Sequence, residues 1–187
     1  MDTRTAILDA AEIALRSHGQ NGFSYQDLSK VVGIRTASIH YHFPSKTDLI
    51  ITLIQRYTRR VQVQFERLEV SPKTAGQRLD AFIDINRGAL EDGHCLCLCV
   101  ALLLAPDDLN QAARDELLAF RTEELAWLGR CFALGAKDGT IRDCASPEIE
   151  AAACLALVEG AQLAARAATD VGWFDRAIAP LKARITG

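Results

Sequence analysis

The stretch from residue 24 to residue 48 constrains the fold of this chain of 187 residues more than any other part. Ser24, with an aspartate three positions later, is a capping signal that predicts a helix beginning just after it. Gly33 stands where a tight turn between two helices needs a residue that is free to adopt positive φ. Ile39 and Phe43, four residues apart, are spaced to anchor a second helix onto the first. This order of cap, glycine turn and apolar anchors predicts a helix-turn-helix.

The second helix of this motif has an informative outer surface. Once Ile39 and Phe43 point inward, its surface and flanks consist of hydrogen-bonding side chains without a carboxylate, as a helix entering an anionic DNA groove requires. Lys46 falls in the first turn of the next helix, where a cation opposes the helix dipole unless it faces a phosphate together with nearby N–H groups. A small helical core with a solvated lysine is the alternative. The predicted DNA-contacting residues are Ser24, Gln26, Arg35, Thr36, Ala37, Ser38, His40, Tyr41, His42 and Lys46.

A family resemblance lies in the N-terminal part of the chain, up to Leu49. Its residues are Ala10-Ala11, Gly19, Phe23-Ser24, Asp27-Leu28, Gly33-Ile34, Ser38, Tyr41-His42-Phe43 and Ser45-Lys46 through Leu49. With them the chain resembles the TetR-type (TetR/AcrR) transcriptional regulators, although Ser29 stands where that family usually has alanine. The resemblance implies an all-α fold, in which a three-helix helix-turn-helix head is joined to a larger helical body for ligand binding and dimerisation. It implies a DNA-binding repressor, not an enzyme, that a small-molecule effector releases from its operator.

Composition and charge agree with a globular DNA-binding chain. Apolar residues make up 49% and charged residues 24% of the sequence, and the net charge is −3. Residues 1–70 carry nine Lys/Arg against seven Asp/Glu, whereas the rest carry twelve against seventeen, so the N-terminal end is the better suited to DNA. No basic-then-apolar leader is apparent, and the longest apolar run, Cys95 to Ala105, is too short to span a bilayer. Together with six cysteines, these features predict a cytoplasmic location.

Apolar periodicity predicts helices along the whole chain. We expect a head at residues 1–48 and a body at residues 49–187, connected by the helix 46–68. Within the body, the apolar segment from His94 to Leu104 is expected to be central. The remaining predicted helices run from Thr3 to His18, from about Lys73 to Leu90, from about Leu109 to Leu134, from about Pro147 to Ala168 and from about Trp173 to Ile185.

The last two predicted helices suit a contact between two copies of the chain. The first of them is rich in alanine with Gly160 among them, so that other helices approach it closely from several sides, and the second carries an apolar stripe that starts at Trp173. The resemblance implies a four-helix dimer contact here, and a core within one subunit is the alternative. One short recognition helix contacts few bases, and two copies related by a two-fold axis read a palindrome.

The segment that contains Cys95, Cys97 and Cys99 has three interpretations. On a helix Cys95 and Cys99 share a face, while Cys97 points nearly opposite. The three thiols are buried small hydrophobic groups, or they sense an oxidant or electrophile through a partly exposed thiolate, or they bind a soft metal. The metal interpretation lacks the Cys-x-x-Cys pairing of common zinc sites. We predict neither a metal site nor a cofactor.

An effector pocket in the body is implied by the resemblance rather than by the residues themselves. Aromatic side chains at helical spacing are more often simple core than pocket walls, and charges such as Arg121 and Glu124 are more often solvated than bound to a ligand. Two rival functions are a helical protein that handles thiols or metals and an enzyme with a helical cavity, for which no catalytic set or phosphate-binding loop is found. The candidate ligand or sensor residues are Phe82, Cys95, Cys97, Cys99, Leu103, Phe120, Arg121, Trp127 and Cys131.

Overall fold

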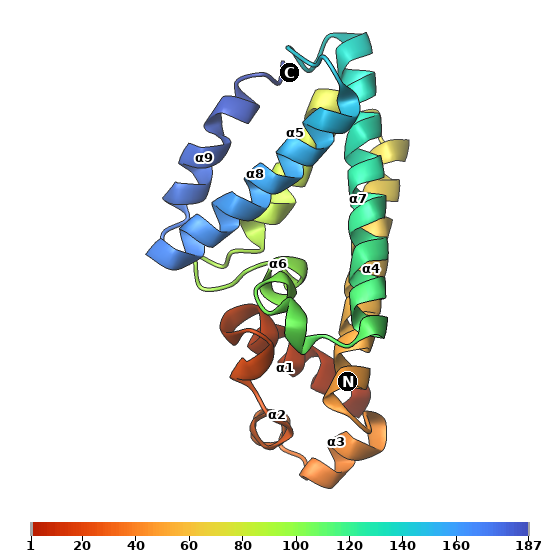
Figure 1. Cartoon of the computed structure of the whole chain (residues 1–187), viewed down its shortest axis with the longest axis vertical. Coiled ribbons are helices and arrows are strands. Elements are labelled where there is room, and N and C mark those ends of the chain that lie inside the picture. The colour runs from red at the N-terminus through yellow and green to blue at the C-terminus, as the bar shows by residue number, and fades with distance from the viewer. Residues whose placement is uncertain (1, 187) are drawn as a thin grey trace. The chain divides into compact units, whose positions relative to one another are not determined.

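The computed structural model describes residues 2–186 as α-helices joined by short turns (Figure 1). Within this range the single β-type pairing is an isolated antiparallel bridge between Ile141 and Ile185. The all-α fold predicted from the sequence is therefore confirmed. The elements are α1 (Thr3–His18), η1 (Gln20–Gly22), α2 (Tyr25–Val32), α3 (Thr36–His42), α4 (Lys46–Val70), α5 (Ala75–Gly88), α6 (Leu98–Leu103), η2 (Pro106–Asp108), α7 (Gln111–Asp138), α8 (Pro147–Ala168) and α9 (Gly172–Lys182).

The helices form two compact units. The first contains the chain up to Arg59 together with Cys97–Leu118, and the second contains Arg60–Leu96 together with the chain from Ala119 onward. Two long helices, α4 and α7, are each continuous from one unit into the other. The chain thus passes between the units through unbroken helical backbone at both of these points.

The first unit contains the predicted helix-turn-helix. Ser24 caps α2, because its hydroxyl accepts from the backbone N–H of Asp27 at 3.2 Å and its own N–H donates to the Asp27 carboxylate at 3.0 Å. Gly33 ends α2 at φ 74° and ψ 33°, a left-handed conformation that glycine adopts without the penalty of a Cβ atom. Ile39 and Phe43 are 0% and 2% exposed, so the two predicted anchors of the second helix are confirmed.

Residues 94–104 differ from the sequence-based prediction. Residues 91–93 all have positive φ, and the chain becomes helical again only at α6. The Sγ atom of Cys97 caps α6 by accepting from the backbone N–H of Val100 at 3.4 Å. Because α6 packs against α1 and belongs to the first unit, this segment is not central to the body, and Cys95 is not on a helix. The Glu-Asp-Gly sequence at residues 91–93 predicts the turn that follows α5, whereas apolar spacing gave no sign that the chain stays non-helical as far as Cys97.

The second unit is built around stacked aromatic rings. Phe65 of α4 and Trp127 of α7 lie 4.2 Å apart between ring centroids, with 9° between the ring planes. Phe82 of α5 lies 6.0 Å from Trp127, and all three side chains are buried. In the same unit α8 packs against both α5 and α9, and α8 and α9 lie side by side (Figure 1).

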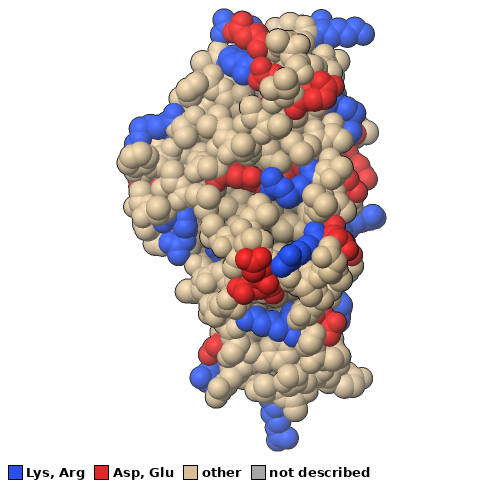
Figure 2. Space-filling model, in the orientation of Figure 1, with Lys and Arg blue, Asp and Glu red and all other residues tan. Residues whose placement is uncertain are grey.

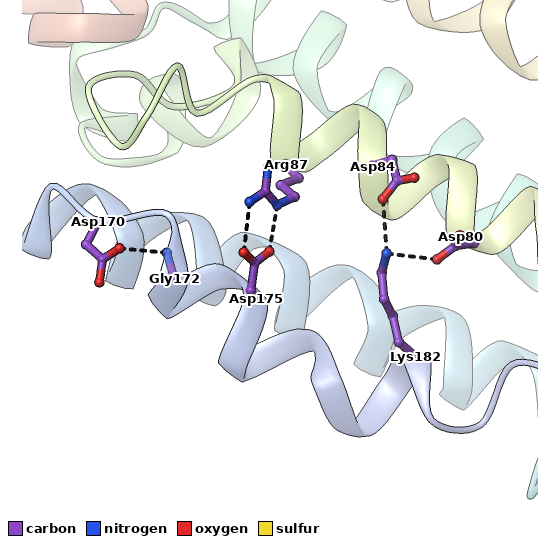
Figure 3. A network of polar contacts seen from close by, with 7 residues as sticks. All are labelled: Asp80, Asp84, Arg87, Asp170, Gly172, Asp175 and Lys182. Atoms are coloured by element: carbon purple, nitrogen blue, oxygen red, sulfur yellow. Dashed lines mark hydrogen bonds and ion pairs between the residues drawn. The ribbon is translucent and has the colours of Figure 1, made fainter.

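Ion pairs fix α9 against α5 (Figure 3). Arg87 donates to both carboxylate oxygens of Asp175, at 2.6 and 2.8 Å, and these bonds lower the pKa of that carboxyl. The Lys182 ammonium lies 2.9 Å from Asp80 and 3.0 Å from Asp84. The side chains involved are roughly half exposed, so each pair stabilises the fold by ~1 kcal/mol or less. Their main effect is to set the position of α9 along α5.

The observed helix ends follow local hydrogen bonding. The bounds predicted for α1 and α8 match the structure, whereas α7 runs a little later than predicted. α5 begins only after Thr74, which forms a capping box with Gln77. α9 stops at Lys182 instead of continuing to Ile185, because Ile185 joins the bridge to Ile141. Extended pairing replaces the last turn of the predicted helix.

α8 is apolar on two faces. Its inner face is buried against the rest of the second unit and includes Leu155 and Val158. Among the described helices it has the length and composition to cross a membrane, with a mean hydropathy of 1.2 and 39% of that window buried. Helices in the cores of non-membrane proteins share these properties. The outer face is exposed and consists of Ile149, Ala152, Ala153, Ala156, Leu157, Gly160, Leu163, Ala167 and Ala168.

Candidate functional site

The exposed side of α3 carries most of the residues predicted to contact DNA. The side chain of Tyr41 is 84% exposed. So high an exposure is unusual for a large aromatic side chain and indicates a contact with a partner. Residues 28–47 contain no aspartate or glutamate. Figure 2 shows a basic group in the region where Figure 1 labels α3, with a wide uncharged surface beside it. The exposed residues of this helix and its N-cap are Arg35, Ala37, His40 and Tyr41, and the half-buried ones are Thr36, Ser38 and His42.

Helix α2 holds α3 in place through Tyr25. Its hydroxyl donates to the backbone oxygen of Phe43 at 2.9 Å, and its ring lies edge-on to that of His40 at 4.8 Å. Burial, with a smaller contribution from Asp48, raises the pKa of Tyr25 to about 12, so the phenol remains a hydrogen-bond donor. This bond joins residues 18 positions apart, so no local signal in the sequence predicts it.

The start of α2 presents Ser24 and Gln26 to solvent. The Ser24 hydroxyl is engaged with Asp27, from which it lies 2.6 Å. Hydrogen bonds from the Ser24 hydroxyl and backbone hold the pKa of Asp27 below its usual value. Ser24 therefore has a structural role as the N-cap of α2, in addition to its predicted role at the DNA surface.

The side chain of Lys46 is half-buried and already contacts other groups of the protein. Its ammonium donates to the backbone oxygen of Phe23 at 2.7 Å and lies 4.3 Å from the centre of that ring. Burial lowers the pKa of Lys46, with an opposing contribution from Asp108. An ammonium has three N–H donors, and the bond to Phe23 uses one of them. In this position Lys46 joins the start of α4 to the segment that precedes α2.

The predicted effector-site residues are divided between the two units. Cys97, Cys99 and Leu103 belong to the first unit, whereas the others belong to the second. Among the latter, the structure brings Phe82 and Trp127 together around Phe65. Phe120 and Cys131 are buried as well.

Two charged residues of α7 are not the solvated helix charges that the alternative interpretation expected. Arg121 forms an ion pair with Glu159 of α8. Glu124 is 8% exposed. Burial, followed by the nearby Glu159 carboxylate, raises the pKa of Glu124 to about 7, and Arg121 opposes this rise. The second unit thus contains a buried acid next to an ion pair.

The cysteines resemble small buried hydrophobic groups. All six are free thiols, and only Cys144 is not fully buried. Burial raises the pKa of Cys131 and of Cys154 to about 12, which suppresses the thiolate that oxidation and metal binding require. Among the described residues no group of three or more His, Cys, Asp or Glu side chains is placed to hold a metal ion.

Known proteins resemble this chain in both the head and the whole fold. Residues 7–53 match the family model for bacterial regulatory proteins of the tetR family. A TetR-family transcriptional regulator from Agrobacterium tumefaciens has 33% identity, with 99% of this chain and 98% of that one covered and a TM-score of 0.91. The transcriptional repressor KstR2 of Rhodococcus jostii RHA1 is 23% identical over 145 residues, which is 74% of this chain and 68% of KstR2. AibR, solved with isovaleryl coenzyme A and operator DNA, shares the fold at a TM-score of 0.70 and 20% identity, covering 87% of this chain and 86% of AibR.

Proposed function

Because this chain belongs to the TetR family of DNA-binding transcriptional regulators, and is not an enzyme, we propose that it is a cytoplasmic repressor. In this proposal a homodimer binds a palindromic operator, and a small-molecule effector releases it. Residues 1–48 form the DNA-binding part, and residues 49–187 form the part that binds the effector and the second subunit. No cofactor or membrane takes part.

The observation that carries the proposal is the exposed surface of α3. Tyr41, His40 and Arg35 project from a helix that α2 holds by the Tyr25 hydroxyl bond. Donor-rich side chains on a fixed helix fit the major groove, where base edges offer acceptors and phosphates flank the groove. We assign Tyr41 and Lys46 to phosphates and assign Thr36 and His40 to base edges. Ser24, Gln26, Arg35, Ala37, Ser38 and His42 complete the proposed contact surface.

The outer face of α8 supports the homodimer. Ile149 is 70% exposed there, and Leu157 and Leu163 are 36% and 37% exposed. Small residues between them let a second helix approach closely, and the exposed charged residue of this helix, Glu148, lies in its first turn. Trp173 at the start of α9 is 50% exposed and adds a large apolar side chain. An apolar surface of this kind on a non-membrane protein marks a contact site, and we place α8 and α9 of the second subunit on it.

Effector binding fits the body of this fold. The second unit contains an aromatic cluster and the buried Glu124, and AibR, which has the same fold, was solved with both a coenzyme A thioester and operator DNA. α4 is one continuous helix from Lys46 to Val70. A ligand that bends or rotates this helix in the body therefore changes the position of the head, and in a dimer it changes the spacing of the two recognition helices. We infer that this change of spacing is how the effector releases DNA.

Selection of bound sequences from a random duplex library tests the proposal. We expect a two-fold symmetric consensus whose half-sites are about one helical turn apart. In anisotropy titrations on that consensus, Tyr41→Ala should weaken binding about tenfold without changing the melting temperature, because the side chain is 84% exposed. Leu104→Ala, an exposed apolar residue after α6, is the matched control and should bind as the wild type does. An asymmetric consensus would refute the palindromic operator, and full affinity in Tyr41→Ala would refute the α3 surface.

A further inference from the structure

A cleft lies between α4 and α7 in the second unit, away from the proposed DNA and dimer surfaces. Its volume is about 390 Å³, within the range of small-molecule sites. Its floor includes Phe65 and Trp127, the stacked pair of the aromatic cluster. The other residues that line it are Gln62, Glu66, Glu69, Glu123, Ala126 and Arg130.

The charge of this cleft is strongly one-sided. Three carboxylates and one guanidinium line it, a formal charge of −2. Arg130 is committed to Glu69 at 2.8 Å, and Glu123 accepts from the amide of Gln62 at 2.6 Å. Glu66 has no ion-pair or hydrogen-bond partner among the described residues, and it is exposed at the rim. Glu66 therefore offers a free carboxylate to a ligand beside an apolar floor, and Glu123 adds a second negative charge, because an amide does not neutralise it.

Trp127 provides a second and independent indication of a ligand. The residue is 2% exposed and lines the cleft, and its Nε1 atom is buried without a hydrogen-bond partner in the described structure. Buried indole N–H groups usually have an acceptor, because leaving a donor unpaired costs about 1–3 kcal/mol. A ligand that enters deeply enough to reach this buried atom would satisfy the donor.

We propose that this cleft binds an organic cation that has an apolar ring system. The ring system lies on the Phe65–Trp127 floor, and the positive charge lies at the rim beside Glu66. The negative charge of the cleft disfavours phosphorylated and carboxylated ligands. The cleft should therefore bind cations more tightly than anions of similar shape. The proposal does not depend on repression or on effector release, because it concerns binding to the second unit alone.

The test uses the full chain and two probes that differ in charge. N-methylacridinium is a permanent cation, and acridine at pH 8 is its neutral parent with the same three-ring frame. The chain has two tryptophans, and Trp173→Phe leaves Trp127 as the sole indole reporter. In the absence of DNA we expect N-methylacridinium to quench Trp127 fluorescence in a saturable way. Its dissociation constant should be at least fivefold lower than that of acridine. The preference should shrink in 0.5 M salt, because the contact with Glu66 is exposed.

Glu66→Gln in the Trp173→Phe background isolates the charge, since it removes one unit of charge at nearly constant shape. We expect it to weaken N-methylacridinium about fivefold, the ratio that one ion contact in water gives, and to leave acridine unchanged. Glu91→Gln, at an exposed glutamate outside the cleft, should leave both affinities as they were. Absence of quenching, equal affinity for the two probes, or an unaltered affinity in a folded Glu66→Gln protein would each overturn the proposal. None of these results would affect operator binding, so the proposed function is tested separately.

Discussion

Helices α3 and α8 each present a face that the rest of the chain leaves uncovered, but the two faces have opposite chemistry. Around α3 most exposed side chains can form hydrogen bonds and none is a carboxylate, and Tyr41 is 84% exposed. Along α8 the exposed groups are aliphatic and small, and Ile149 is 70% exposed. Exposure by itself therefore indicates a partner but not its kind. Hydrogen-bond donors indicate a polyanion, whereas an uncharged aliphatic stripe indicates another apolar helix.

The two helices also differ in how the protein supports them. α3 has 7 residues and is anchored by Ile39, by Phe43 at its C-cap and by the hydroxyl of Tyr25. α8 has 22 residues and is buried along its whole inner face. Changes on the outer side of either helix should therefore alter binding with little effect on folding. Changes beneath α8 should alter stability first.

The largest effect should come from a charge on the outer face of α8. Leu157→Arg would place an unpaired guanidinium inside the proposed dimer contact, which costs several kcal/mol. We expect the dimer dissociation constant to rise at least 100-fold and operator affinity to fall with it. Sedimentation equilibrium measures the first quantity, and circular dichroism checks that the monomer remains folded. Leu118→Arg, at a residue of α7 that is 65% exposed, is the matched control and should remain dimeric.

A folded Leu157→Arg dimer of normal affinity would remove α8 from the interface. The aliphatic face of α8 would then have to bind a partner other than a second copy of the chain. Dissociation of the Leu118→Arg protein as well would show that the contact extends to α7.

An intermediate effect should come from Glu124, which lies on the buried side of α7. Its pKa is about 7 in the folded protein and 4.5 ordinarily, so the folded state binds more protons between these values. Stability should therefore fall as pH rises from about 4.5 to about 7, by up to ~3 kcal/mol at full ionisation. Urea denaturation at several pH values measures this loss. Glu124→Gln should flatten the pH dependence by the same amount.

The exposed neighbour Glu123 supplies the control, since Glu123→Gln changes one charge on the same helix. That variant should retain the decline in stability between pH 4.5 and 7 shown by the wild type. Identical pH profiles for Glu124→Gln and the wild type would mean that the carboxyl is hydrated in solution.

The smallest effect should come from the cap of α2. Ser24→Ala removes the acceptor for the Asp27 N–H and should lower the unfolding free energy by about 1 kcal/mol. Ser24→Thr retains the acceptor and should stay close to the wild type. Operator affinity, measured well below the melting temperature, separates the two roles of Ser24. A loss of affinity in Ser24→Ala that exceeds its loss of stability would indicate a direct DNA contact.

Much of the fold and part of the candidate site were accessible from local sequence signals. The Ser24 cap, the left-handed Gly33 and the Ile39/Phe43 anchors each depend on residues within one or two helical turns, and the structure has all of them. The bonds of Tyr25 to Phe43 and of Lys46 to Phe23 join residues 18 and 23 positions apart. No periodicity encodes such bonds, so their structural roles were not predicted.

The sequence by itself determined the all-α fold, the position of the helix-turn-helix and the alanine-rich character of α8, because each follows from the order of side chains along one helix. Tertiary structure decided the rest. It placed α6 against α1, buried Glu124 beside Arg121 and Glu159, and put an acidic rim around the Phe65–Trp127 floor. These features arise where helices distant in the sequence meet, and only the folded chain fixes which side chains share that space.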